Sequence, residues 1–75
     1  MMKINVKLVG MFRLGRFKEK LLEYPCGARV FDVVDDLQLP EDVLGIILIN
    51  GVHAGEQDSL KDGDALSLLP MLDGG

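Results

Sequence analysis

The sequence is poor in cysteine and histidine. It holds one of each, Cys26 and His53, among 75 residues. A single cysteine excludes an intramolecular disulfide, a cysteine-built zinc site and an iron–sulfur cluster made by this chain alone. Cys26 has no histidine base near it in sequence, and His53 has no second histidine with which to share a metal. We therefore expect Cys26 to be structural or incidental and His53 to be a surface histidine. We expect a reducing cytoplasm to be the compartment.

Positive charge and long apolar runs are also scarce. Eight Lys/Arg against twelve Asp/Glu give a net charge of -4, which repels a phosphate backbone and argues against nucleic-acid partners. Seven basic residues precede Val30 and ten acidic residues follow from Asp32 onward. This asymmetry either steers a complementary partner or only solvates the surface. No run approaches the roughly 20 apolar residues needed to cross a bilayer, so we expect no membrane association.

What the chain does have fits one small globular domain. Its residues are 48% apolar and 27% charged, far from the composition of disordered chains. The N-terminus alternates between apolar and polar residues over 3–9, which predicts a half-buried strand. A polar connection over 11–18 and a second strand over 20–24, ending at Pro25, complete a predicted hairpin. We expect a monomer on its own.

The period changes after the hairpin, and residues 30–37 predict an amphipathic helix that ends before Pro40. Its apolar face consists of Val30, Val33, Val34 and Leu37. Its opposite face consists of Asp32, Asp35 and Asp36. These carboxylates lie on a face that should be exposed, so solvation explains them better than acid/base catalysis.

Two more strands follow. Residues 45–49 form a continuous apolar run closed by an Asn-Gly turn, and residues 65–69 alternate before Pro70. The stretch 53–59 between them is polar and irregular. Strand, strand, helix, strand, strand predicts a two-layer α+β fold with the helix across one face of a sheet.

Three short motifs make the sequence specific: ING at 49–51, LKDGD at 60–64 and LLPMLDGG at 68–75. In this order they resemble the MoaD/ThiS family of ubiquitin-like sulfur carriers, over essentially the full length. The resemblance implies a β-grasp fold, with a mixed sheet of four to five strands and one main helix packed on one face. It also implies a domain over 1–70 and a flexible tail over 71–75.

In that family the reactive group is the carboxylate of the last glycine. By resemblance, an activating enzyme of the ubiquitin-activating type (MoeB/ThiF-like) adenylates Gly75 with ATP, and sulfur replaces AMP to give a thiocarboxylate. No cofactor is expected on the chain itself, which is not an enzyme. Gly74 and Gly75 lack side chains and can therefore thread a narrow channel. The six residues from Pro70 onward can span roughly 20 Å.

The body behind the tail should carry a partner-binding surface. Alternation places Val9 and Leu69 on the outer face of the sheet, where they could join Met71 and Leu72 in an exposed apolar patch, the alternative being scattered surface residues without a role.

Two charged features qualify this picture. Asp73 departs from the family, in which a small or apolar residue more often precedes the glycines. The basic residues Arg13, Arg16 and Lys18 either contact an acidic partner or only solvate a loop.

The leading functional hypothesis is sulfur donation in molybdopterin (molybdenum or tungsten cofactor) biosynthesis, with the chain as small subunit of molybdopterin synthase and the large subunit as partner. The runner-up is sulfur donation for thiamine thiazole, with thiazole synthase as partner. Protein modification or tRNA thiolation through the same activated end is a third hypothesis. A non-catalytic β-grasp binding module is the fourth, and it would tolerate an extra residue after Gly75.

Overall fold

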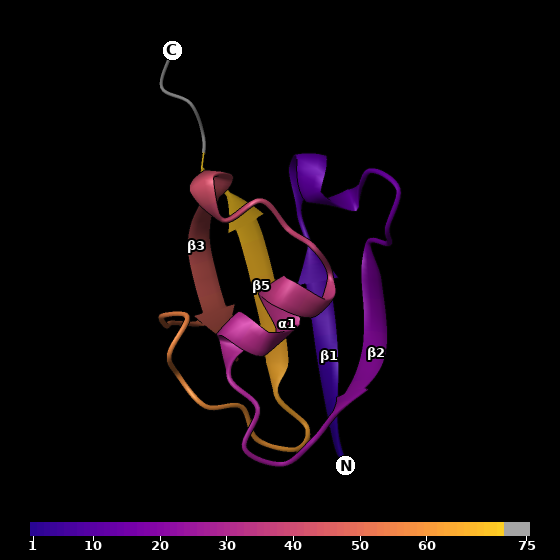
Figure 1. Ribbon diagram of the computed structural model, residues 1–75, viewed down its shortest axis with the longest axis vertical. Coiled ribbons are helices and arrows are strands. Elements are labelled where there is room, and N and C mark those ends of the chain that lie inside the picture. The colour runs from indigo at the N-terminus through magenta and orange to yellow at the C-terminus, as the bar shows by residue number, and fades with distance from the viewer. Residues whose placement is uncertain (72–75) are drawn as a thin grey trace.

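The computed structural model describes residues 1–71 of the chain, which form one mixed sheet with a helix across it (Figure 1). The strands are β1 (Met2–Leu8), β2 (Glu19–Tyr24), β3 (Leu44–Ile49), β4 (Val52–His53) and β5 (Ala65–Pro70). The helices are α1 (Val30–Asp36) and two short 3-10 turns, η1 (Gly10–Arg13) and η2 (Glu41–Val43).

The strand order in the sheet is β2-β1-β5-β3-β4. The N-terminal hairpin pairs β1 with β2 in antiparallel fashion, as the sequence predicts, with Ile4 opposite Leu22. The last strand, β5, enters the middle of the sheet, parallel to β1 and antiparallel to β3. The last strand in the sequence is therefore the central strand of the sheet. Each of its two neighbours, β1 and β3, also pairs with a strand on its other side.

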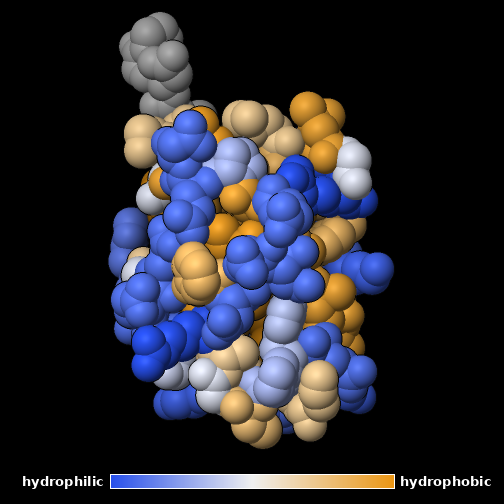
Figure 2. All heavy atoms as spheres, viewed as in Figure 1, coloured by the Kyte–Doolittle hydropathy of each residue, from blue (hydrophilic) through white to orange (hydrophobic). Residues whose placement is uncertain are grey.

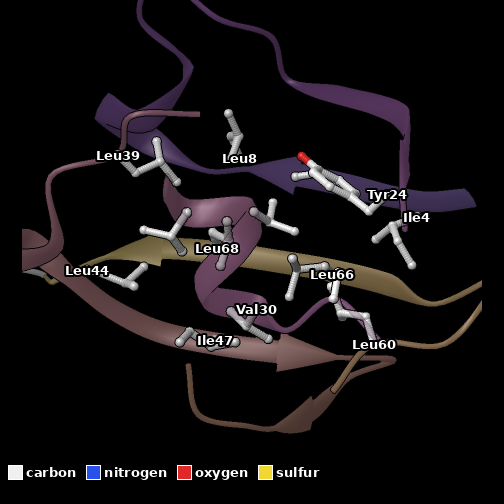
Figure 3. Close-up of a cluster of buried hydrophobic side chains, with 14 of the residues drawn as sticks. Ile4, Leu8, Tyr24, Val30, Leu39, Leu44, Ile47, Leu60, Leu66 and Leu68 are labelled. Atoms are coloured by element: carbon white, nitrogen blue, oxygen red, sulfur yellow. The ribbon is translucent and has the colours of Figure 1, made fainter. Parts of the chain in front are cut away.

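The core lies between the sheet and α1, and the alternation in the sequence decides what enters it (Figure 3). On β1, Ile4 and Val6 have no exposed surface, while Lys3 and Lys7 point to solvent. On β5, Leu66 and Leu68 are fully buried. The helix contributes the residues predicted for its apolar face, and three of them are fully buried: Val30, Val33 and Val34. Burial of this kind stabilises the fold by roughly 25 cal/mol per Å² of apolar surface.

Two segments differ from the sequence prediction. Val52 and His53 form the short strand β4 at the sheet edge, where only a turn and an irregular stretch are predicted, because two residues are too few to show an alternation. The predicted polar connection over 11–18 contains η1, and Phe12 within it is 1% exposed. The connection therefore belongs to the core as well as to the surface.

The boundaries of the other elements lie within one residue of those predicted. The first strand ends at Leu8 instead of Val9, and α1 ends at Asp36 instead of Leu37. None of the helices within residues 1–71 has the length and apolar character that a membrane crossing requires.

Candidate functional site

The C-terminal segment starts from the middle of the sheet. β5 lies between β1 and β3, and Leu68 is opposite Leu8 on one side and Ile47 on the other. Leu68 has no exposed surface, so both neighbouring strands and the core beneath hold this part of β5. The end of β5 at Pro70 is therefore a well-held starting point for the residues that follow (Figure 1).

Three neighbouring segments contact this starting point. Pro70 is opposite Leu44 in the register of β3 and β5. The backbone N–H of Met71 donates a hydrogen bond to the carbonyl oxygen of Val43, the last residue of η2. On the other side, a Cβ built on Gly10 would lie 3.4 Å from Cγ of Pro70. The chain therefore passes between Gly10, at the start of η1, and the junction of η2 with β3.

An apolar surface lies next to this exit, on the face of the sheet opposite α1. The register of β3 and β5 aligns Ile46 with Leu69, and Leu48 lies two residues farther along the same face. The N–H of Val9 donates a 3.2 Å hydrogen bond to the carbonyl of Leu68, which places Val9 beside β5. Because Val9 is extended and follows the buried Leu8, its side chain points to the outer face. We call these residues, together with the exposed Met71 that follows β5, the outer apolar surface; it consists of Val9, Ile46, Leu48, Leu69 and Met71.

The exposure of these residues differs. Met71 is 59% exposed and Ile46 is 41% exposed, whereas Val9, Leu48 and Leu69 are partly buried. By contrast, hydrophilic side chains cross much of the helix side of the molecule (Figure 2). The outer apolar surface is therefore concentrated on the side of the sheet that α1 leaves uncovered.

Three of these residues are predicted from the sequence and two are not. Val9 lies beside β5 next to Leu69, and Met71 follows two residues after Leu69 in the chain. That they form one patch with Leu72, and that this patch binds a partner, stay predictions. Ile46 and Leu48 were missed, although the continuous apolar run over 45–49 carried the signal, because a strand that is apolar at every position has apolar side chains on both faces.

The remaining predicted site residues, Leu72, Gly74 and Gly75, lie outside the described residues. The same holds for the division into a domain over 1–70 and a tail over 71–75, which stays a prediction.

The basic residues of the hairpin connection do not act as one group. Arg16 Nε donates to the carbonyl of Leu37 at 3.0 Å, and Arg16 Nη2 donates to the carbonyl of Gln38 at 2.9 Å. Both acceptors lie just past the end of α1, where carbonyls lack partners within the helix and a cation is favourable. Arg16 therefore ties the hairpin to the helix, while Arg13 and Lys18 are exposed.

Two of the three motifs that carry the resemblance, ING and LKDGD, meet at the opposite end of β5. Asn50 Nδ2 donates to Asp64 Oδ1 at 2.9 Å, and Asn50 Oδ1 accepts from the N–H of Ala65 at 2.9 Å. Asp64, only 8% exposed, also accepts from the N–H of Lys61 at 2.8 Å. The ING and KDGD motifs are thus one hydrogen-bonded connection that joins β3 to the start of β5. They shape the fold and lie far along the sheet from the exit of the chain.

The side chains considered for catalysis or metal binding lie apart. Cys26 is exposed after β2, and His53 is exposed on the edge strand β4. Within residues 1–71 there is neither a cluster of three potential metal ligands nor a detectable pocket.

The helix carboxylates have structural partners. Asp32 accepts a 2.8 Å hydrogen bond from the N–H of Arg29, which caps the start of α1. Asp36 accepts one of 2.9 Å from the hydroxyl of Tyr24. Burial, and secondarily the neighbouring carboxylate, raise the pKa of Tyr24 well above its usual range. Two of the three carboxylates on the polar face of α1 therefore have a structural role, and no catalytic role is needed to explain them.

Comparison with known proteins supports the resemblance. The ThiS family model matches residues 6–75. A protein from Pyrococcus furiosus described as molybdopterin converting factor, subunit 1, is 28% identical, with 96% of this chain and 100% of that chain covered and a TM-score of 0.78. No curated protein sequence matches significantly.

Two further solved structures are similar. One is a complex of subunits 1 and 2 of molybdopterin-converting factor from Helicobacter pylori, with 25% identity, 99% of this chain and 100% of that chain covered, and a TM-score of 0.66. The other is SAMP1 from Haloferax volcanii, with 25% identity, 97% of this chain and 99% of that chain covered, and a TM-score of 0.75.

The fold of the described residues agrees with the fold of the similar solved structures. The described residues form a five-stranded mixed sheet with one α-helix on one face, and the solved relatives share this ubiquitin-like β-grasp architecture, which confirms the predicted fold. The family match extends over nearly the whole chain, from the first strand through both glycines. The chain belongs to the ThiS family of ubiquitin-like sulfur carriers.

Proposed function

We propose that this chain carries sulfur for molybdopterin biosynthesis and that the carboxylate of Gly75 is the reacting group. An activating enzyme of the ubiquitin-activating type adenylates this carboxylate with ATP and releases pyrophosphate. Sulfur then replaces AMP to give a thiocarboxylate, which donates its sulfur to a pterin precursor. The observation that carries the proposal is the family match, which covers residues 6–75 and so includes Gly75.

The geometry before that residue is consistent with a carrier. The last strand is clamped between β1 and β3, so the body holds the start of the C-terminal segment in one place. The described residues contain no cluster of ligands or pocket for chemistry of their own. On this proposal the body positions and identifies the chain, and the partners supply the active sites.

Two of the solved relatives favour the molybdopterin branch. Both are described as subunits of molybdopterin converting factor, and one was solved with its subunit 2. By this analogy the chain is the small subunit of molybdopterin synthase, and the outer apolar surface contacts the large subunit. Apolar patches of this kind are typical of protein interfaces. The cytoplasm, in which ATP and reduced thiols are present, is the expected compartment.

Sulfur donation for thiamine thiazole is the second candidate, and the name of the matching family favours it. It uses the same thiocarboxylate and differs only in the acceptor. Protein modification is the third, supported by the likeness to SAMP1, the small archaeal modifier protein 1 of Haloferax volcanii. The three candidates therefore differ in the molecule that reacts with the activated end of the chain.

The chemistry is tested by the intact mass of the protein purified from its host. We expect a species heavier by the difference between one sulfur and one oxygen atom, located on Gly75 by fragmentation. A mass that shows no sulfur exchange under conditions of active cofactor synthesis contradicts the proposal. The same measurement determines which residue ends the chain in the host.

A variant with one alanine added after Gly75 provides the control for the reactive end. It should no longer release pyrophosphate with the activating enzyme, whereas an alanine added before Met1 should have no effect. If neither the natural chain nor either variant releases pyrophosphate, the chain is a binding module and not a carrier. If both variants release it equally, Gly75 is not the required last residue, which contradicts the proposal. Incubation of the thiocarboxylate with the large synthase subunit and its pterin precursor, or with thiazole synthase and its substrates, then identifies the acceptor by the transfer of sulfur to it.

A further inference from the structure

β3 approaches the start of the C-terminal segment more closely than a side chain would allow. A Cβ built on Gly45 would lie 2.7 Å from Cα of Met71, 2.8 Å from its backbone nitrogen and 3.1 Å from the carbonyl carbon of Pro70. Distances below 3.0 Å are not tolerated, and these neighbours are backbone atoms that cannot rotate away. Any other residue at position 45 must therefore displace Pro70 and Met71.

Gly45 occupies an irregularity in the strand pairing. Leu44 is opposite Pro70 and Ile46 is opposite Leu69, so Gly45 is one extra residue on β3. Bulges of this kind bend a strand and redirect its neighbours. The φ of Gly45 is not in the left-handed region, which means that alanine could adopt the same backbone conformation. Glycine is required here for space and not for flexibility.

The close approach has a consequence for hydrogen bonding. The carbonyl of Val43, two residues before Gly45, accepts the N–H of Met71. This bond forms because nothing separates the backbone of β3 from the backbone of Met71. It fixes the first residue after β5 against the end of η2.

We propose that Gly45 is a positioning residue for the reaction at Gly75. Its missing side chain lets Pro70 and Met71 lie against β3 and so sets the direction in which the C-terminal segment leaves the body. The inference rests on the proposed function, because it assigns Gly45 a part in presenting the carboxylate. Only four residues follow Met71, and they span at most roughly 14 Å. With so short a reach, the starting point and direction decide whether the carboxylate enters a partner's site.

The test compares Gly45→Ala with Gly55→Ala as a matched control. A Cβ on Gly55 meets only Asp58 Oδ2, at 3.9 Å, which is an ordinary contact, and the φ of Gly55 is also outside the left-handed region. Both variants add one methyl group to a glycine outside a helix. Both are assayed as full chains with ATP and the activating enzyme of the same organism, by release of pyrophosphate at varied chain concentration.

The kinetic parameters separate positioning from folding. The chain is the substrate of the activating enzyme, so a merely destabilised chain lowers the concentration of folded substrate and raises the apparent KM without changing kcat. A misdirected segment instead lowers kcat, because the body still docks while the carboxylate is misplaced. Small misplacements of a reacting group can reduce rates by about a hundredfold. We expect kcat to fall at least about tenfold for Gly45→Ala and to be unchanged for Gly55→Ala.

Amide hydrogen exchange at Met71 tests the contact independently of any variant. In the natural chain, the Met71 N–H should be protected to an extent comparable with the amides of β5, and Gly45→Ala should abolish this protection. Exchange at the rate of an unstructured peptide in the natural chain overturns the inference, even if Gly45→Ala proves unable to fold. An unchanged kcat for a folded Gly45→Ala also overturns it. If the natural chain is not adenylated at all, the proposed function fails, and the positioning role of Gly45 falls with it.

Discussion

At the scale of single residues, Asn50 shows how one side chain joins two distant segments. Its φ of 53° lies in the left-handed region, which asparagine tolerates better than most residues. Its amide donates to Asp64 and accepts from the N–H of Ala65, fourteen and fifteen residues away. Without this side chain, the largely buried Asp64 would lose one partner and the start of β5 would lose another.

We therefore expect Asn50→Gly to lower the free energy of unfolding by about 2 kcal/mol, because removing one partner leaves another group unsatisfied. Glycine also accepts a positive φ, so the change isolates the lost hydrogen bonds from backbone strain. Urea denaturation followed by circular dichroism measures the effect.

Gln38→Gly is the matched control for this substitution. Gln38 is the other non-glycine residue with positive φ in residues 1–71, at 55°, and its side chain makes one exposed hydrogen bond to Asp35. Its replacement should change stability by less than about 0.5 kcal/mol. Equal losses in both variants would contradict the role assigned to Asn50.

The sequence predicts the turn at Asn50 but not its partner. An Asn-Gly dipeptide after an apolar run favours a tight turn by its local conformational preference. The contact with Asp64 depends on how the chain returns to the sheet, which no local pattern contains. For the same reason Gly45 could not be distinguished from any glycine at a strand end: the atoms that exclude its side chain belong to residues 70 and 71.

At the scale of elements, α1 is a short helix held by its surroundings. It has seven residues, and its β-branched valines weaken its intrinsic propensity. The periodicity of its apolar residues nevertheless predicts it correctly, because the buried face supplies its stability. The contacts that fix its C-terminal end are not predictable: Arg16 reaches the carbonyls after it, and Tyr24 on β2 donates to Asp36.

The bond from β2 to α1 makes stability depend on alkaline pH. Burial and the neighbouring Asp36 raise the pKa of Tyr24 above its ordinary value of 10.0. The unfolded chain therefore loses this proton at a lower pH than the folded chain. The contribution is fully present below pH 10 and decreases as the pH rises above 10, because unfolding then releases a proton.

We expect Tyr24→Phe to lose about 1 kcal/mol of stability at neutral pH, the value of a typical hydrogen bond, and to show a weaker decline above pH 10 than the natural chain. Urea denaturation at several pH values gives the comparison, and lysine ionisation affects both proteins alike. Tyr24 is the only tyrosine, so phenolate absorbance reports on it alone. Titration of that absorbance near the ordinary value would contradict the prediction.

At the scale of the whole molecule, the sequence predicts the class and order of elements better than their arrangement. Alternation and the helical period indicate four strands and a helix, whereas the parallel pairing of β1 with β5 is implied only by the resemblance. That pairing joins residues about sixty positions apart, such as Val6 and Leu66. It places the end of β5 at the centre of the sheet, beside the outer apolar surface, where the proposed function needs the C-terminal segment to begin.

The outer apolar surface lies over β3 and β5, on one side of the sheet, and its proposed role in binding can be tested there. If the outer apolar surface contacts the large synthase subunit, Ile46→Asp should weaken that association by at least about tenfold, or about 1.4 kcal/mol. Ile46 is 41% exposed and points away from the core, so a charge there should leave the chain folded and lower the free energy of unfolding by about 1 kcal/mol. Titration calorimetry with the large subunit measures the affinity.

Leu21→Asp is the control, because Leu21 is opposite Asn5 on the same face and is 58% exposed, yet it lies on β2 at the far edge of the sheet. Both substitutions place one carboxylate on an exposed aliphatic position, and they lower the net charge equally. A general effect of charge or of lost apolar area would therefore weaken binding in both. Weakening by Ile46→Asp alone locates the interface over β3 and β5, next to the point where the chain leaves the body, whereas equal affinities for both variants and the natural chain place the partner on another face.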